Sequence, residues 1–348
     1  MIHTTHFGSL PDGRPVGKHT LRNTGGMSVE IIEWGAIVTS IRVPDRHGSL
    51  EDVVLGFDTL EPYLAIHPYF GAIVGRIAGR VAEGRLVIDG ESLQLPCNDG
   101  EHHLHGGSGG LDKVLWHAQK CLDRPSGAER LRLHFRSPDG DQGYPGNLDI
   151  RTTYTLTETN EFIIETEGCS DKPTPLSLTH HSYFNLAGAG SGTIGNHELR
   201  IFSDRIVEMD DDLCPTGKVI PVAGCPGDFR KPRLLSDAIP HLHHRHGDLY
   251  LLDSAVPSGP GPAARVSHHA SGRRLDVSTT ETCLQLYTSS HFAKPIIGKS
   301  GKVYPRHAAL CLECEGYSNA TIHPGFSDIL IRPGIPQRHT TIYSFTTF

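Results

Sequence analysis

Three polar segments interrupt otherwise structural sequence and carry side chains suited to proton transfer, at residues 98–107, 179–186 and 310–316. In the third segment, Glu313 follows the apolar run 309–312, which is typical of a buried strand. Desolvation and neighbouring charges tune the proton affinity of a carboxylate at such a place, and this suits a general base. From the pattern alone, a glutamate that ends a strand and faces water fits equally well.

Histidine is the usual proton donor at neutral pH, because its ordinary pKa lies close by. The chain has 23 histidines, so any single one is expected at the surface unless another observation selects it. The run 241–246 is rich in histidine but has no spacing typical of metal ligands. We expect this run to form a solvated loop without a function.

Two other motifs lack the context that their chemistry needs. Residues 106–110 satisfy Gly-x-Ser-x-Gly, but a nucleophile elbow needs a buried strand before it and a helix after it. Here a histidine-rich stretch precedes the motif and the β-like residues 114–116 follow it. Cys311 and Cys314 form a C-x-x-C without the second pair that would complete a zinc site. We therefore expect two thiols of a core strand, no metal and no cofactor.

The composition excludes some classes of partner. The formal net charge of −7 and the pI near 6.3 give no basic excess, so we expect no nucleic-acid partner. The first residues lack the features of a signal peptide, and no apolar run approaches the roughly 18 residues that span a bilayer. The eight cysteines are scattered along a chain large enough to fold without disulfides. We expect a cytoplasmic monomer or homodimer with reduced thiols and no membrane partner.

Period-2 alternation is the dominant pattern along the chain and predicts many short strands. From 148 to 156 the even positions carry Leu, Ile, Thr, Tyr and Leu, while the odd positions are polar. Residues 131–136 alternate in the same manner. The segments 86–88 and 93–95 flank Asp89-Gly90, which predicts a hairpin with a type I′ turn.

Helical patterns are scarce, and we expect only one or two turns at 59–65 and at 234–239. The 39 glycines and 24 prolines are spread along the chain between the expected strands, which favours strands joined by turns over βαβ units. Residues 257–262 predict a long loop between two hairpin arms at 250–252 and 264–266. The whole pattern predicts one all-β domain over residues 1–348.

These segments, in this order, resemble the galactose mutarotase (aldose 1-epimerase) family from about Phe7 to Phe348. The ordered set over nearly the whole chain is highly specific, although no single tetrapeptide is. The matching segments are Val53–Phe57, Gly75–Arg80, Leu104–Gly107, Leu111–Trp116, Asp139–Gly146, His181–Gly188, Pro215–Gly217, Leu312–Glu313, Arg332–Gly334 and His339–Thr341. The resemblance implies a galactose mutarotase-like β-supersandwich of twisted antiparallel sheets, with few short helices and an open cleft on one face.

The resemblance also implies which side chains do the chemistry. Glu313 looks like the family's general base, which takes the proton from the anomeric hydroxyl of a sugar. His181 looks like the general acid that protonates the ring oxygen, and His105 resembles a second cleft histidine that hydrogen-bonds near the reacting centre. The positions at which the family holds sugar hydroxyls are matched by Arg80, Asp248 and Gln285.

The residue types fit this chemistry. Opening a hemiacetal ring needs one proton taken from O1 and another delivered to the ring oxygen. A carboxylate and an imidazolium supply both at neutral pH, and each positioned group typically contributes ~10²–10⁴-fold. Charge-assisted hydrogen bonds, donated by Arg80 and accepted by Asp248, would orient the sugar. The implied reaction needs no metal, nicotinamide or covalent intermediate.

The chain departs from the family's usual residues around this site. Gly79, His102 and His180 stand where the family commonly has Asn. The usual Glu-Thr-Gln of the base motif is Glu313-Cys314-Glu315 here. A following Pro-Asp-Ala is replaced by Ser318-Asn319-Ala320, and the His-Asn after Asp248 by Leu249-Tyr250. The two proton-transfer residues are kept while much of the expected substrate shell differs, so the preferred sugar is left open.

We therefore expect an aldose 1-epimerase that interconverts the α and β anomers of a free sugar of the galactose or glucose class. An isomerase of the same fold, acting on another cyclic hemiacetal or hemiketal or on a sugar phosphate, would keep Glu313 and His181. A sugar phosphate would want a cationic cluster at the cleft rim. A carbohydrate-binding module without catalysis is the alternative from another class, but a pure binder needs no paired proton donor and acceptor.

Overall fold

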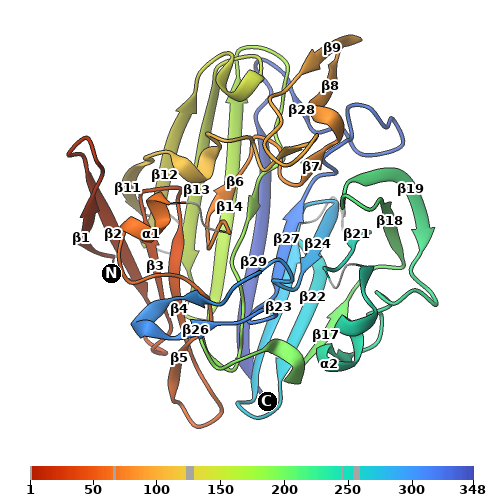
Figure 1. Cartoon of the computed structure of the whole chain (residues 1–348). Helices are drawn as coiled ribbons and strands as arrows, with labels where there is room; N and C mark the ends of the chain where they lie inside the picture. The colour runs from red at the N-terminus through yellow and green to blue at the C-terminus, as the bar shows by residue number, and fades with distance from the viewer. Residues whose placement is uncertain (1, 66–67, 123–128, 244–245, 254–258) are drawn as a thin grey trace.

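The computed structural model describes residues 2–65, 68–122, 129–243, 246–253 and 259–348, and antiparallel strands make up most of it (Figure 1). Within these ranges the α-helices α1 (Glu61–Leu64) and α2 (Leu235–Ala238) are single turns, at the two places where the sequence predicts them. Short 3₁₀ turns lie at Ala82–Gly84, Leu111–Lys113, Asp141–Gly143, Ile194–Asn196, Ile239–His241 and Lys299–Gly301. The predicted all-β class is confirmed. Part of each of the predicted loops 241–246 and 257–262 lies outside the described residues.

The N-terminal sheet is a five-stranded meander that lies on the left in Figure 1. Its strands pair in chain order, each with the next, because short turns connect them. They are β1 (His3–Ser9), β2 (Pro15–Arg22), β3 (Ser28–Ile32), β4 (Val38–Pro44) and β5 (Leu50–Asp52). Every residue of β3 is at least partly buried, so both faces of this central strand are covered.

A nine-stranded antiparallel sheet forms the centre of the molecule. In spatial order its strands are β11 (His117–Leu122), β12 (Glu129–Ser137), β13 (Leu148–Leu156), β14 (Glu161–Ser170), β29 (Gln337–Thr347), β23 (Arg273–Thr279), β22 (Gly261–His268), β17 (His197–Ile201) and β20 (Arg233–Leu234). The strand predicted at 148–156 is β13, and its even-numbered side chains are buried as the alternation requires. The largest apolar cluster joins this sheet to the other two, with members such as Ile31, Tyr154 and Leu312.

The third sheet has five strands in the order β19-β18-β21-β24-β27 and lies on the right in Figure 1. The strands are β19 (Pro215–Pro221), β18 (Arg205–Met209), β21 (Leu249–Leu251), β24 (Cys283–Tyr287) and β27 (Cys311–Glu315). All five residues of β24 and all five of β27 are buried, so both faces of these strands are covered. Cys311 and Cys314 are free buried thiols on β27, as predicted.

Short two-stranded ladders fix the loops between the sheets. They pair β6 (Ile73–Val74) with β16 (Thr179–His180), β7 (Arg80–Val81) with β10 (His103–Leu104), β15 (Thr174–Pro175) with β28 (Leu330–Ile331), β25 (Ile296–Ile297) with β26 (Val303–Tyr304), and β8 (Arg85–Ile88) with β9 (Glu91–Gln94). The last pair is the predicted hairpin. Its two turn residues, Asp89 and Gly90, both have positive φ, at 50° and 87°, as a type I′ turn demands.

The hairpin predicted around residues 257–262 is wrong. One expected arm is β21, which pairs with β18 and β24 in the five-stranded sheet. The other arm lies in β22, which pairs with β17 and β23 in the nine-stranded sheet. The two arms therefore belong to different sheets, because each finds its partner among strands that are distant in the sequence.

Arg76 ties the segment before β7 to a distant loop. Its buried guanidinium donates to Ser137 Oγ and to the carbonyl oxygens of Ser137, Pro138, Pro145 and Gly146 at 2.8 to 3.1 Å. A buried guanidinium needs such a set of acceptors, because its donors have no water to bond. Arg76 is thus a structural residue, and it braces the chain that leads to the cleft.

His197, at the start of β17, is fully buried and held as a neutral acceptor. Its Nε2 accepts the backbone N–H of Leu186 at 2.9 Å, and its Nδ1 lies 3.0 Å from Asn196 Oδ1. Burial and the neighbouring His268 ring lower the pKa of His197 to about 3. Protonation would place a donor against the Leu186 N–H, so the fold opposes it.

We therefore expect His197 to contribute to acid sensitivity. The folded pKa lies below the ordinary 6.5, so the stabilisation is complete above pH 6.5 and is lost as the pH falls toward 3. In His197→Gln, which keeps an acceptor without the titration, the free energy of unfolding should fall less between pH 7 and pH 5, by about 2 kcal/mol. Urea unfolding of both proteins at the two pH values measures this, and equal losses would contradict it.

Candidate active site

An open cleft of about 160 Å³ lies where the five-stranded sheet meets the short ladders. The register of the sheet aligns one row of side chains with this cleft. Leu249 on β21 pairs with Gln285 on β24, and Gln285 pairs with Glu313 on β27. Cross-strand partners point to the same face of a sheet, and all three of these side chains line the cleft. The β-ladder therefore supplies one wall of the site.

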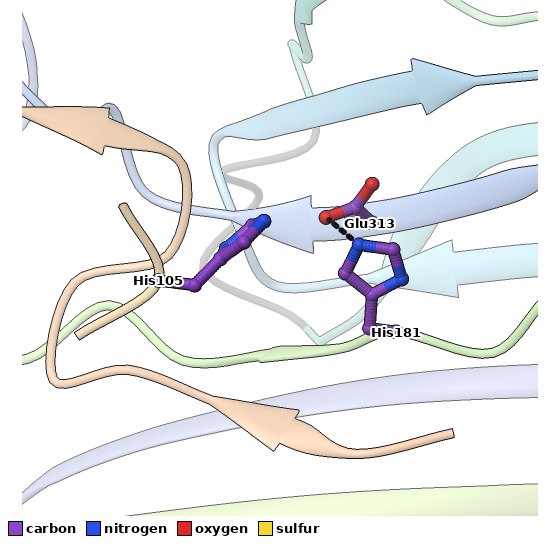
Figure 2. Close-up of side chains that lie close together, drawn as sticks. All are labelled: His105, His181 and Glu313. Atoms are coloured by element: carbon purple, nitrogen blue, oxygen red, sulfur yellow. Dashed lines mark ion pairs between the residues drawn. The ribbon is translucent and has the colours of Figure 1, made fainter. Parts of the chain in front are cut away.

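Glu313 lies in the middle of β27 and is only 2% exposed, so it does not end a strand in water. Its Oε2 is 3.4 Å from Nε2 of His181 (Figure 2). Burial raises the pKa of Glu313 above the ordinary 4.5, and the positive charge of Arg80 works in the opposite direction. The result is a carboxylate with a strengthened proton affinity at the surface of a cleft.

His181 follows β16 directly and continues its ladder with β6. Its N–H donates to the Ala72 carbonyl at 2.9 Å, and its own carbonyl accepts the Gly71 N–H at 3.0 Å. The imidazole is 3% exposed and stacks on Tyr183 and Tyr69, with ring centroids 5.1 and 5.7 Å away. Backbone and ring contacts together aim the imidazole at Glu313.

His105 follows β10 and is locked against Gly79 by two hydrogen bonds. Its N–H donates to the Gly79 carbonyl at 3.2 Å, and its Nδ1 accepts the Gly79 N–H at 3.2 Å. Burial and the nearby His181 ring hold the pKa of His105 well below its ordinary value, so the ring is neutral. Because Nδ1 accepts, the single ring proton lies on Nε2. His105 is thus a fixed donor.

One nitrogen or oxygen from each of His105, His181 and Glu313 lies within 4.8 Å of the others (Figure 2). Two imidazoles and a carboxylate form a ligand set that zinc enzymes use. A metal-binding Nε2, however, needs a proton on Nδ1 and an acceptor behind it, whereas the backbone here presents an N–H to Nδ1 of His105. The arrangement therefore suits proton exchange better than metal binding.

Arg80 lies at the cleft and is oriented from both ends. Its Nε donates to Asp99 Oδ2 at 2.7 Å, and its carbonyl accepts bonds from Ser318 Oγ at 2.7 Å and Asn319 Nδ2 at 3.0 Å. The 318–319 pair follows β27, so the strand that bears Glu313 also holds the backbone of Arg80. Five of the six predicted side chains therefore converge on the cleft: Glu313, His181, His105, Arg80 and Gln285.

The structure does not bring Asp248 into the cleft, and its position does not support the expected role. Its neighbour Leu249 faces the cleft, so strand alternation turns Asp248 to the other side. There its Oδ2 lies so close to Gly227 that a Cβ at that residue would be 2.0 Å away. Among residues 246–251, Leu249 and His246 line the cleft, and His246 is 7% exposed.

Sequence reasoning missed several side chains of the cleft, among them Tyr69, Tyr183, His246, Tyr287 and Glu315. Period-2 spacing from His181 would have found Tyr183, and from Glu313 it would have found Glu315. The residues that depart from the family's usual ones divide between the cleft and other places. Gly79 and Ser318 line the cleft, whereas Cys314 and His180 do not and instead lie near Glu281 behind it. His102 lines an adjoining hollow.

Comparison with known proteins identifies the family. Residues 17–344 match the aldose 1-epimerase family model. The galactose mutarotase of Rattus norvegicus is 43% identical over 99% of this chain and 98% of its own, and the aldose 1-epimerase of Escherichia coli is 34% identical over 96% of each. A solved aldose epimerase homologue from C. elegans has a TM-score of 0.87, with 30% identity over 95% of this chain and 99% of its own.

Together with the fold and the cleft, these matches define a β-sandwich sugar isomerase. The chain belongs to the aldose 1-epimerase family. It is accordingly an enzyme that interconverts the α and β anomers of aldose sugars. None of the helices in the described part of the chain has the length and apolar character that a membrane crossing requires.

The locked ring of His105 leads to a prediction. In His105→Asn the amide oxygen can still accept the Gly79 N–H, but no donor reaches the place of Nε2. We expect a melting temperature close to that of the wild type and a kcat/KM for anomer exchange lowered ~10²–10³-fold, the usual effect of removing one positioned donor. His269→Asn, at a side chain that is 63% exposed, is the matched control. An unchanged kcat/KM in His105→Asn would contradict the donor role.

Proposed function

We propose that the chain equilibrates the anomers of an unphosphorylated aldose of the galactose or glucose class, with Glu313 as general base and His181 as general acid. The observation that carries this proposal is the 3.4 Å contact between His181 Nε2 and Glu313 Oε2, both buried at the wall of one cleft. The substrate class follows the galactose mutarotases of mammals, which are 40 to 43% identical to this chain.

In the proposed mechanism, Glu313 removes the proton from the anomeric O1 while His181 delivers a proton to the ring oxygen. The bond between C1 and the ring oxygen breaks, and an open-chain aldehyde forms. Rotation about the C1–C2 bond then presents the other face of the carbonyl. Ring closure reverses both transfers: His181 takes the proton from the attacking hydroxyl and Glu313 returns one to O1. Both side chains end as they began.

The surroundings suit each step. The raised pKa of Glu313 makes it a stronger base than a carboxylate in water, and Arg80 limits the rise so that the carboxylate still forms. The Nε2–H of His105 can donate to an oxygen whose negative charge grows during ring opening. Tyr69, stacked on His181 and 4.8 Å from the ring of His105, excludes water from one side of both imidazoles.

Charges at the rim argue against a sugar phosphate. A second hollow of about 510 Å³ adjoins the cleft and shares Arg80 with it. It is lined by four acidic side chains and two arginines, namely Asp99, Glu101, Asp211, Asp212, Arg80 and Arg306. An excess of carboxylates repels a phosphate dianion and tolerates neutral hydroxyls.

Proton NMR of freshly dissolved α-D-galactose and α-D-glucose tests the proposal. We expect the wild-type protein to accelerate anomer exchange, and Glu313→Gln and His181→Asn each to lower kcat by ~10²–10⁴-fold, because each removes one positioned proton-transfer group. Binding of sugar without acceleration would instead favour a binding module, and activity on a phosphosugar alone would favour the phosphate alternative. Full activity of either variant would contradict the assigned roles.

The pH dependence of kcat/KM offers a separate test, since it reports the pKa values of the free enzyme. Because burial raises the pKa of Glu313, activity should be lost on acidification at a pH above the ordinary glutamate value of 4.5. Removing the charge in Arg80→Gln destabilises the carboxylate, so the acid limb should move to higher pH; Arg80→Lys, which keeps a charge, should move it less. An acid limb that stays in place, or moves to lower pH, would contradict the coupling.

A further inference from the structure

Glu315 is a second buried carboxyl group at the cleft, and the mechanism above does not use it. It lies two residues after Glu313 on β27, so both side chains point to the same face of the strand. Glu315 is 2% exposed and lines the cleft together with Gly79 and Ser318. Burying a carboxyl group without a hydrogen-bond partner costs free energy, so we expect Glu315 to bind another group.

One oxygen of this carboxyl group, the buried Oε2, has no hydrogen-bond partner in the described part of the protein. Ser318 is adjacent, but its hydroxyl already donates to the Arg80 carbonyl at 2.7 Å. Buried polar atoms of native proteins are nearly always bonded, so a carboxyl group that lines a cleft and has one oxygen unbonded is suited to bind a ligand's hydroxyl.

Gly79 packs directly against Glu315 because it has no side chain. A Cβ at Gly79 would lie 3.0 Å from Glu315 Oε1 and 3.4 Å from Ser318 Cβ. Three of the departures from the family's usual residues, at positions 79, 315 and 318, thus meet at one point of the cleft. They act as a single altered contact surface, which we call the Gly79–Glu315–Ser318 wall.

The surroundings of Glu315 favour the neutral form of its carboxyl group. Burial, with the negative charges of Glu313 and Glu281, holds its pKa well above the ordinary value. Two thiols are also near: Cys283 is the partner of Glu315 on β24, and Cys314 precedes it on β27. The guanidinium of Arg80 lies at the same cleft. A protonated carboxyl both donates and accepts, which matches the two capacities of a sugar hydroxyl.

We propose that Glu315 is a specificity-determining residue, whose carboxylic acid hydrogen-bonds one ring hydroxyl of the sugar while Glu313 holds the anomeric hydroxyl. The proposal rests on the function proposed above and adds the contact that selects among aldoses. No bond is made or broken at Glu315. Its contribution is to substrate recognition, so it should act on KM more than on kcat.

A cycle of protein variants and deoxy sugars tests this contact. The variants are Glu315→Met, similar in size but without donor or acceptor, and Glu315→Gln, which keeps both. The probes are whichever of glucose and galactose the wild type equilibrates faster, and the 2-, 3-, 4- and 6-deoxy forms of that sugar. We expect Glu315→Met to lower kcat/KM for the parent sugar about tenfold or more, mainly through KM, and Glu315→Gln to lower it less.

The coupling identifies the contact. For one deoxy sugar, which lacks the bonded hydroxyl, wild type and Glu315→Met should have equal kcat/KM, whereas the other deoxy sugars keep the full difference. Glu281→Gln is the matched control, because it changes a neighbouring buried carboxyl that does not line the cleft, and it should give no coupling. An equal loss in Glu315→Met for the parent and for every deoxy sugar would overturn the proposal.

Gly79→Asn tests the same wall from the opposite side and guards against misfolding of the Glu315 variants. Asn tolerates the positive φ of 75° at this position, and its side chain would contact Glu315 Oε1. We expect it to weaken the same hydroxyl contact, because its Cβ displaces the carboxyl group of Glu315, and to lower the melting temperature only slightly. If Glu313→Gln retained full activity, the proposed function would fail; if it were inactive and Glu315→Met gave no coupling, only this inference would fail.

Discussion

The burial of one carboxylate beside one imidazole is the constraint on which the rest of the structure depends. Taking charged groups out of water is costly, and their mutual attraction repays this cost only in good geometry. Glu313 and His181 are 2% and 3% exposed, and Glu313 Oε2 lies 3.4 Å from His181 Nε2. Moving either side chain would leave the other buried without its partner. The same desolvation that destabilises the ionised carboxylate strengthens it as a base, which is how cost and function are linked.

Three structural units hold this pair in register. The five-stranded sheet places Glu313 and Gln285 side by side, the ladder of β6 and β16 holds His181, and the ladder of β7 and β10 holds His105 against Gly79. Each unit fixes its side chain through backbone hydrogen bonds, which are less adaptable than side-chain contacts. Backbone hydrogen bonds do not depend on the side chain, so sugar-facing positions such as 79 and 315 can carry another residue while their backbone still holds the site. This explains how the proton-transfer residues can persist while the substrate shell changes.

The sequence predicted local features well and distant pairings poorly. Alternation located β13, and Asp89-Gly90 located the hairpin of β8 and β9, because both signals lie within the segment itself. The partners of β21 and β22 lie far along the chain, so turn residues between them could not reveal that they enter different sheets. The extent of one domain over residues 1–348 stays a prediction.

The site residues, too, were predicted well where a motif marks them and poorly where distant segments decide their surroundings. The family motifs led to five side chains that do converge on the cleft. Pattern alone left Glu313 undecided between water and interior, since its burial comes from β24 and from segments outside β27. Asp248 was assigned from the family resemblance, and the structure places its side chain against Gly227 while its neighbour Leu249 lines the cleft. His246 takes the cleft position instead.

A crystal structure of Glu313→Gln with galactose bound would test the role of the pair most directly, because the variant traps the sugar without converting it. We expect O1 of the sugar within hydrogen-bonding distance of the side chain at position 313, and the ring oxygen within that distance of His181 Nε2. A sugar bound with its anomeric carbon turned away from both side chains would contradict the central claim that these two groups exchange the protons of ring opening.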